Sequence, residues 1–194
     1  MNRANVPMSK NTYTPEQLDS IVLSAQQGQT EAFEKLYNAF VDQIYRYTYY
    51  RVGREDALDL TETVFLKVWE NIKSYKTGRK YFSAWIYRIA HNIVVDHYRL
   101  NKETVELSYD VPDTDRESNP LRLAEQSLSN DVLMKAVSKL KKKYQQVIIL
   151  KYINELDNRE IAQIMRRSEG SLRILKFRAL RALRQIMEDM NIRY

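Results

Sequence analysis

Apolar residues recur at spacings of three and four positions along most of this chain, which is the period of a helix with one buried face. No strand-like alternation competes with that pattern. We therefore expect an all-α fold. With their capping residues, the predicted helices run from Thr14 to Gly28, Thr30 to Gly53, Glu55 to Ile72, Tyr81 to Arg99, Asp131 to Leu140, Tyr144 to Ile153, Asp157 to Met165 and Ser168 to Met190.

Local signals mark the ends of the first two helices. Thr14 precedes Pro15, which is a hydroxyl N-cap followed by a proline at the first helical position. Thr30 is a possible N-cap of the second helix. Gly28 and Gly53 follow the last apolar positions of the two helices, so we expect the helices to stop there.

The helical period is lost in the middle of the chain, where acids and prolines break the pattern. This stretch predicts an acidic flexible linker between two small helical domains. We therefore divide the chain into a disordered N-terminus (1–13), a helical domain (14–100), the linker (101–130) and a second helical domain (131–194) that contains a helix-turn-helix.

The net charge of +6 is unevenly distributed over the 194 residues. It amounts to +2 for residues 1–100, −4 for residues 101–130 and +8 for residues 131–194, so we expect the last segment to bind a polyanion. Cysteine is absent, which excludes disulfides and thiolate metal sites. Since no run approaches the ~18 apolar residues of a membrane span and no secretory pattern opens the chain, we expect a cytoplasmic protein.

The stretch from Tyr81 to Arg99 has two different faces when placed on a helix. One is an ordinary core stripe, formed by Phe82, Ile86, Ile89, Ala90 and Ile93. Beside it lies a row of aromatic, guanidinium, amide and carboxylate groups: Tyr81, Trp85, Arg88, Asn92, Asp96 and Arg99. Aromatic rings stack on unpaired bases, and Arg and Asn bond phosphates and base edges, so the row is a candidate nucleic-acid surface. The simpler interpretation is that Trp85 packs in the core and the charged residues form a solvated face.

A short basic loop, residues 73–80, directly precedes this helix and carries four cations and a tyrosine. A basic loop next to an aromatic row could enclose a single strand of nucleic acid. Its candidate contact residues are Tyr75, Lys76, Arg79 and Lys80.

The C-terminal part predicts a helix-turn-helix. Asp157 with Glu160 three residues later is a capping-box pattern, and Ser168 is a further expected N-cap. A short helix, a tight turn and a long basic helix follow one another, and such a long helix fits the major groove of DNA. The alternatives are a basic surface helix in a small bundle and a basic amphipathic helix at a membrane. The membrane alternative is disfavoured because the helix holds no Trp and a single Phe.

These motifs resemble the sigma subunits of bacterial RNA polymerase, specifically the small two-domain extracytoplasmic-function group, over roughly residues 15–100 and 131–190. Phe82 to Arg99 matches the family pattern FxxWxxRIAxNxxxDxxR. Asp56-Ala57-Leu58-Asp59-Leu60 resembles the clamp-binding helix, and Glu160-Ile161-Ala162, Gly170-Ser171 and Arg178-Ala179 resemble the minus-thirty-five reader.

The resemblance implies that this chain is a sigma factor that directs promoter-specific transcription initiation, recognising and melting the minus-ten element with its N-terminal domain. The implied partners are core RNA polymerase, through the clamp of the largest subunit and the flap of the second-largest, promoter DNA and an anti-sigma factor. No cofactor, metal or enzymatic activity is implied. The implied site residues are Asp56, Asp59, Leu60, Glu62, Phe65 and Trp69 for polymerase, Tyr75, Lys76, Arg79, Lys80, Tyr81, Trp85, Arg88, Asn92, Asp96 and Arg99 for the minus-ten element, and Arg167, Ser168, Glu169, Gly170, Ser171, Arg173, Ile174, Phe177, Arg178 and Arg181 for the minus-thirty-five element.

The chain departs from its relatives at three places that concern these sites. Glu62-Thr63 stands where many relatives have Gln and an acid, and Arg166-Arg167 stands in the tight turn where a glycine and an apolar residue are common. Ile174-Leu175 replaces a polar Ser-Arg pair of the recognition helix. The last change could mean apolar contact with thymine methyl groups or tighter packing.

Two other classes of function compete with this interpretation. A helix-turn-helix transcriptional regulator that does not join polymerase would share the basic C-terminal part, but it would not depend on the acidic helix at residues 56–62. An enzyme has little support, since His91 and His97 do not share a helical face and the chain contains neither a glycine-rich phosphate loop nor a nucleophile motif.

Overall fold

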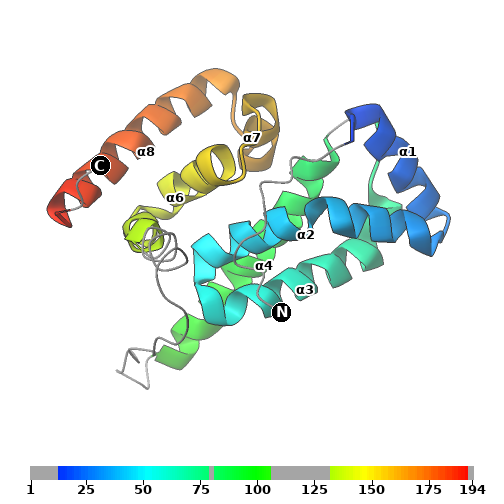
Figure 1. Ribbon diagram of the computed structural model, residues 1–194, viewed down its shortest axis with the longest axis horizontal. Coiled ribbons are helices and arrows are strands. Elements are labelled where there is room, and N and C mark those ends of the chain that lie inside the picture. Colours follow the sequence, from blue (N-terminus) through cyan, green and yellow to red (C-terminus); the bar gives the residue numbers. More distant parts are fainter. Residues whose placement is uncertain (1–12, 79–80, 106–131, 192–194) are drawn as a thin grey trace, which may run out of the picture.

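The computed structural model of the chain describes residues 13–78, 81–105 and 132–191, and all regular elements in these ranges are helical (Figure 1). The all-α prediction is therefore confirmed for this part of the chain. The first group comprises α1 (Pro15–Gln26), α2 (Thr30–Val52), α3 (Arg54–Asn71), the 3-10 turn η1 (Ile72–Ser74) and α4 (Phe82–Val105). The second group comprises a helical segment at 132–138, α6 (Lys142–Ile148), the π-helical turn η2 (Ile149–Ile153), α7 (Asn158–Met165) and α8 (Glu169–Asp189).

Side-chain capping sets the start of α1 as predicted. Gln17 N–H donates to Thr14 Oγ1 at 3.3 Å, and Thr14 N–H donates to Gln17 Oε1 at 2.8 Å, which is a complete capping box. The predicted cap of α2 was wrong by one residue. Thr30 is the first residue of the helix, and Gln29 occupies the N-cap position without a side-chain bond. Gly53 ends α2 with φ of 93°, a conformation that a side chain would strain.

Helix α4 is longer than predicted. It continues past Arg99 to Val105, which is five residues into the expected linker. The reason is local, since the sequence from 100 to 105 contains no glycine or proline and the next proline is Pro112. The remainder of the predicted linker, 106–130, and residues 1–12 of the predicted N-terminal tail lie outside the described residues.

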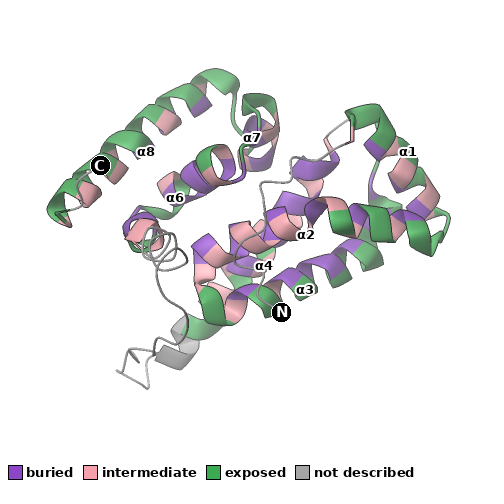
Figure 2. Cartoon of the chain, in the orientation of Figure 1, coloured by how far each residue is buried: buried purple, intermediate pink, exposed green. Residues whose placement is uncertain are grey.

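The core of the first group is built where α2, α3 and α4 pack side by side (Figure 1). Figure 2 shows the buried residues gathered along the facing sides of these helices. The largest buried side chains include two tyrosines, Tyr47 on α2 and Tyr87 on α4, with ring centroids 5.4 Å apart. Of the predicted α4 stripe, Phe82, Ile86 and Ala90 are buried, whereas Ile89 and Ile93 are partly exposed.

The second group buries the inner faces of α6, α7 and α8 against one another, with Ile148, Ile161 and Leu172 among its most buried side chains. Asp157 caps α7 as predicted: Glu160 N–H donates to Asp157 Oδ1 at 2.7 Å, and the Glu160 carboxylate accepts the Asp157 N–H at 3.1 Å. Within the described ranges, no helix is both long and apolar enough to span a membrane.

The two groups of helices share one cluster of buried apolar residues, and polar side chains also join them. Asn154 Nδ2 donates to the backbone oxygen of Gln43 at 2.9 Å and to the hydroxyl oxygen of Tyr87 at 2.6 Å. Gln145 Nε2 donates to the backbone oxygen of Tyr50 at 3.1 Å. All three contacts join α6 or the turn after η2 to α2 or α4, so they hold the second group on the first.

This polar contact is incompletely satisfied. Gln145 Oε1 and Asn154 Oδ1 are buried without a hydrogen-bond partner among the described residues, as is Nε of Arg51. Arg51 is 5% exposed, and its Nη1 donates to the hydroxyl of Tyr47 at 3.0 Å. Unpaired buried polar atoms oppose burial, typically by about 1–3 kcal/mol each. The two unpaired oxygens of Gln145 and Asn154 therefore weaken the contact between the two groups.

Candidate nucleic-acid interface

The mixed row on α4 grades from half-buried to exposed along the helix. Tyr81, Trp85 and Arg88 are half-buried, whereas Asn92, Asp96 and Arg99 are exposed. Arg99 Nη1 lies 3.5 Å from Asp96 Oδ1, an exposed pair of small energetic weight. The structure therefore brings all six residues onto one side of α4, as the sequence predicted, with the aromatic end deeper than the polar end.

Tyr75 from the preceding loop lies under the aromatic end of this row. It is only 6% exposed, and its ring centroid is 5.4 Å from those of Phe82 and Trp85. Burial raises the pKa of the Tyr75 hydroxyl to about 12, helped by the nearby Asp19 carboxylate and opposed by Arg88. The sequence placed Tyr75 among the DNA-contacting residues, but in this structure its ring supports Trp85 from below and is not open to a base.

Helix α1 fastens the loop that carries Tyr75. Gln26 Nε2 donates to the backbone oxygens of Ile72 and Tyr75, at 2.8 and 2.7 Å. The Gly78 N–H donates to Asp19 Oδ2 at 3.0 Å. These anchors were missed from the sequence because both partners lie about 50 residues away along the chain. Of the predicted loop contacts, Lys76 is exposed, and Arg79 and Lys80 lie outside the described residues.

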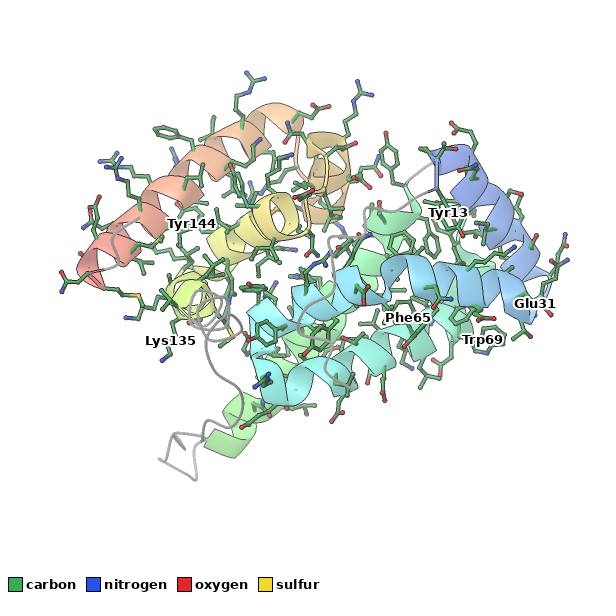
Figure 3. All side chains as sticks on the ribbon, viewed as in Figure 1. Tyr13, Glu31, Phe65, Trp69, Lys135 and Tyr144 are labelled. Atoms are coloured by element: carbon green, nitrogen blue, oxygen red, sulfur yellow. The ribbon has the colours of Figure 1, made fainter. Side chains whose placement is uncertain are left out.

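Helix α3 presents a second candidate surface, which combines acids with exposed apolar side chains. Leu58, Leu66 and Trp69 are 51%, 56% and 45% exposed, and Asp59 and Glu62 share that side of the helix. We call these five residues the α3 outer face. Figure 3 shows Trp69 near Glu31, at the end of the bundle where α2 begins. The Trp69 ring lies edge-on to the Phe33 ring, with 4.8 Å between the ring centroids.

The remaining predicted polymerase contacts are distributed differently. Phe65 is 5% exposed and belongs to the core, and Leu60 is half-buried. Asp56 Oδ2 lies 3.3 Å from His97 Nε2 on α4, so this carboxylate already has a partner. The exposure of Leu58 and Leu66 was not predicted, because an amphipathic pattern shows which side chains can be buried, while the size of the buried face depends on the neighbouring helices.

Two arginines, Arg166 and Arg167, form the turn between α7 and α8. Arg166 adopts φ of 52°, the left-handed conformation in which the helix ends, and Arg167 Nη1 donates to Ser171 Oγ at 3.2 Å. Ser168 caps α8 by accepting the Ser171 N–H at 3.3 Å. The turn thus places two cations at the N-terminus of α8, where free backbone N–H groups already favour an anion.

Helix α8 exposes nearly its whole predicted reading surface. Leu172, Leu175 and Ala179 are buried against the neighbouring helices. Ser171 is half-buried, and the other predicted contacts on or before this helix are exposed: Arg167, Ser168, Glu169, Gly170, Arg173, Ile174, Phe177, Arg178 and Arg181. The long green outer surface of α8 in Figure 2 shows this. The predicted helix-turn-helix is therefore present, and its second helix, α8, is basic and open to solvent.

The start of the α4 row and the helix-turn-helix meet at an open cleft of about 440 Å³, lined by Tyr81, Arg159, Ala162, Gln163, Arg166, Arg167, Ser168 and Glu169. Ser83 Oγ donates to Glu160 Oε1 at 2.5 Å, and the Tyr81 N–H donates to Gln163 Oε1 at 3.4 Å. The N-terminus of α4 and the helix-turn-helix are thus in direct contact. Across the described residues there is no cluster of ligands suited to a metal ion.

This arrangement defines a helical protein with two candidate nucleic-acid-binding surfaces, one on an aromatic and polar helix and one on a helix-turn-helix. Two family models match the same two parts: Sigma-70 region 2 over residues 36–104 and Sigma-70, region 4 over residues 130–183.

Curated relatives agree with the family models. The chain is 34% identical over 174 residues to the ECF RNA polymerase sigma factor BldN of Streptomyces coelicolor, and the match covers 87% of this chain and 65% of BldN. It is 30% identical over 181 residues to the ECF RNA polymerase sigma factor SigW of Bacillus subtilis, covering 87% of this chain and 96% of SigW. This chain belongs to the ECF sigma factors of RNA polymerase, and so to the proteins that direct polymerase to promoters.

Solved structures share the fold. CnrH, in complex with the cytosolic domain of CnrY, has a TM-score of 0.69 at 20% identity, covering 88% of this chain and 97% of CnrH. The sigma factor RpoE from Bartonella quintana, in complex with the anti-sigma factor NepR, has a TM-score of 0.66 at 20% identity, covering 80% of this chain and 96% of RpoE.

Proposed function

We propose that this sigma factor divides promoter recognition between its two groups of helices. The first group, within residues 14–100, docks on the polymerase clamp with the α3 outer face and captures an unstacked base of the minus-ten element beside α4. The second group, within residues 131–194, reads the minus-thirty-five duplex with α8. The chain itself catalyses no reaction, and its role is carried out in the cytoplasm with polymerase.

The α3 outer face supports the docking step. Exposed Leu58, Leu66 and Trp69 would bury apolar area in an interface, while Asp59 and Glu62 would complement a basic partner. Large apolar side chains at about half exposure on a helix that is otherwise well packed are typical of a protein-binding surface. The other three predicted contacts lie outside this face: Asp56 pairs with His97 on α4, Leu60 is half-buried and Phe65 belongs to the core.

The row on α4 supports the melting step. Extruding a base from the stack costs a few kcal/mol, and stacking on an aromatic ring returns about 1–3 kcal/mol per base. Trp85 is held by Tyr75 and Phe82 but stays half-exposed, so one part of the indole remains available. Arg88 and Asn92, one and two turns along the helix, can bond the backbone or edge of the same strand.

The exposed basic side of α8 carries the upstream half of the proposal. Arg173, Arg178 and Arg181 have no acidic partner among the described residues, and each points away from the core. Phosphate contacts of this kind orient a recognition helix in the major groove, and polar contacts near its N-terminus meet base edges.

The packed arrangement in Figure 1 cannot engage both elements together. By their names the two elements lie about 25 base pairs apart, which is ~85 Å of B-DNA. Tyr81 and the start of α8 line one cleft. The groups must therefore separate on a promoter, and the 26 residues from 106 to 131 are enough chain to reach about 90 Å.

The observation that carries this proposal is the pairing of an open basic recognition helix with an aromatic row on α4 in one chain. Promoter binding and strand opening can be measured separately, by duplex retention and by 2-aminopurine fluorescence in the minus-ten element, with holoenzyme assembled from core polymerase. We expect Arg173→Ala and Arg178→Ala to weaken duplex binding. Trp85→Ala and the exposed Asn92→Ala should leave duplex binding intact and slow opening.

Lys139→Ala, an exposed lysine outside both surfaces, is the matched control and should change neither step. Equal loss of both steps in all four variants would refute the division of labour. A helix-turn-helix regulator that acts alone is the second candidate, because the C-terminal group by itself would suit it. Failure of the chain to bind core polymerase would favour that candidate.

Regulation by an anti-sigma protein is also part of the proposal. It is supported by the shared fold with RpoE, which was solved in complex with NepR. The incompletely satisfied polar contact between the two groups would let such a partner select either the packed or the separated arrangement.

A further inference from the structure

The outward side of α8 is not uniformly polar. At about 100° per residue, the direction opposite the buried stripe is shared by Gly170, Arg173, Ile174, Phe177, Arg181 and Arg184, and near the C-terminus by Glu188, which pairs with Arg184. Two of these side chains are large and apolar, and they are strongly exposed: Ile174 at 56% and Phe177 at 69%. Phe177 lies nearly at the centre of this side, and Ile174 is its neighbour one turn nearer the N-terminus.

The exposure of Ile174 settles an alternative that the sequence left open. Tighter packing would place Ile174 in the core, but neither Ile174 nor Phe177 belongs to the buried cluster or to the side chains packed against it. Leu175, the other half of the same departure from relatives, is 6% exposed and does pack. The two substituted positions therefore have different roles: the Leu175 side chain packs in the core, and the Ile174 side chain faces outward.

The surroundings of Ile174 limit what its ligand can be. Arg173 and Arg181 flank it on the same side, and in the described part of the chain no acidic side chain pairs with either. The ligand therefore has to be anionic at the edges and apolar in the middle. A membrane surface fits poorly, since the wide apolar face of α8 is already buried against α6 and α7.

The major groove of DNA offers that combination. Phosphates line both of its sides, and among the base edges that face the groove only thymine carries an apolar group, its 5-methyl. Gly170 fits close approach on the same side: its φ is not positive, and a Cβ there would meet nothing within 4 Å in the protein. Neither backbone strain nor internal crowding thus accounts for the glycine, whereas a nearby duplex would.

We propose that Ile174, with Phe177 beside it, is a specificity-determining residue that contacts thymine 5-methyl groups in the minus-thirty-five element. This inference rests on the proposed function and deepens it, because it names the chemical group that part of α8 recognises. Arg173 and Arg181 then act as the phosphate contacts that hold these apolar side chains against the base edges.

Deoxyuridine provides the test, since it removes one methyl group from thymine and leaves the base pair unchanged. Upstream duplexes would first be selected from a random pool with holoenzyme, and each thymine would then be replaced singly by deoxyuridine. We expect about a fourfold loss of affinity at one or two positions, the effect of burying a single methyl group. Ile174→Ala should weaken binding to the thymine duplex and abolish the discrimination at one of these positions.

Leu180→Ala is the matched control. Leu180 is 41% exposed on the same helix but lies in its C-terminal half, whereas the N-terminal half is the part that meets base edges. The Leu180→Ala variant should therefore keep full discrimination. Three results would overturn the inference: a selected element without thymine, no sensitivity to deoxyuridine, or unchanged sensitivity in both Ile174→Ala and Phe177→Ala. Equal loss of transcription by Ile174→Ala on thymine and deoxyuridine templates would point to a protein partner and also overturn it. Absence of any duplex selection by holoenzyme would instead contradict the proposed function.

Discussion

Asn154 Nδ2 donates a hydrogen bond to the hydroxyl oxygen of Tyr87 at 2.6 Å, joining the turn after η2 to α4 across 67 positions of sequence. Asn154 is 7% exposed and Tyr87 is fully buried. Burial raises the pKa of the Tyr87 hydroxyl well above its usual range, so the group stays a neutral donor and acceptor at any physiological pH. The position of the helix-turn-helix therefore depends in part on one amide.

We expect Asn154→Ala to loosen the packed arrangement. The change removes two hydrogen bonds and leaves the Gln43 carbonyl and the Tyr87 hydroxyl buried without this partner, at about 1–3 kcal/mol for each group. Small-angle scattering or the distance between two fluorescent labels, one on each group of helices, should report separation. Asn71→Ala removes an exposed amide that bonds only within α3, and it should leave the distance unchanged.

His91 makes the same contact sensitive to acid. Its Nδ1 lies 3.4 Å from the Tyr47 hydroxyl and 3.3 Å from Gln146 Nε2, and burial, followed by the charge of Arg51, lowers its pKa below the usual value. The packed state therefore favours neutral His91. The packed state is therefore most stable above the pKa of exposed histidine, about 6.5. It loses stability as the pH falls below that value, because His91 must then be protonated or stay neutral at a cost.

Lowering the pH from 7.5 to 5.5 should thus favour separation in the wild type. The measurement is the label distance at both pH values. His91→Gln removes the titrating group and should reduce the pH-dependent part of the change, while any remainder reports other groups. An identical pH response in the variant would rule His91 out as the cause.

The outer face of α3 can be tested by charge. Leu66→Glu places a carboxylate in the middle of a proposed apolar contact, so affinity for core polymerase should fall at least tenfold, consistent with about 1.5–3 kcal/mol for a buried leucine. Leu66 is 56% exposed in the free chain, so the melting temperature should change little. Leu23→Glu on α1 is the matched control at 48% exposure, and it should bind normally.

Capping of α7 should contribute measurably to stability. Asp157→Ala removes the oxygen that accepts the Glu160 N–H, and we expect the free energy of unfolding to fall by about 1 kcal/mol. Urea titration is the measurement. Ser138→Ala removes an exposed hydroxyl that caps no helix start and should fall within ~0.5 kcal/mol of the wild type. A loss as large for Ser138→Ala would show that the cap itself is not responsible.

Features decided by near neighbours could be predicted from the sequence. The caps at Thr14, Asp157 and Ser168, the stop at Gly53 and the two-faced helix from Phe82 depend on residues within four positions, and the structure has them. The loss of apolar period after Arg99 predicted an earlier end for α4, but no glycine or proline follows before Val105, and the helix continues to that residue.

Features decided by residues far away in the sequence could not be predicted from it. Gln145 and Asn154 are polar residues in an apolar run, and only partners 95 and 67 or more positions away explain their burial. The depth of Tyr75 depends on a ring cluster that forms when the loop folds back on α4. The exposure of Leu58 likewise reflects where α2 and α4 stop covering α3, which no local pattern encodes.

The anchoring of the basic loop by α1 has an evolutionary consequence. The region 2 match begins at residue 36, so α1 lies before it, yet Gln26 and Asp19 of this helix hold the loop in front of Trp85. Relatives that differ only in their first helix would thus place the loop differently on an unchanged α4. We expect exchange of α1 between paralogues to alter how readily each opens a promoter while leaving untouched the sequence that defines the family.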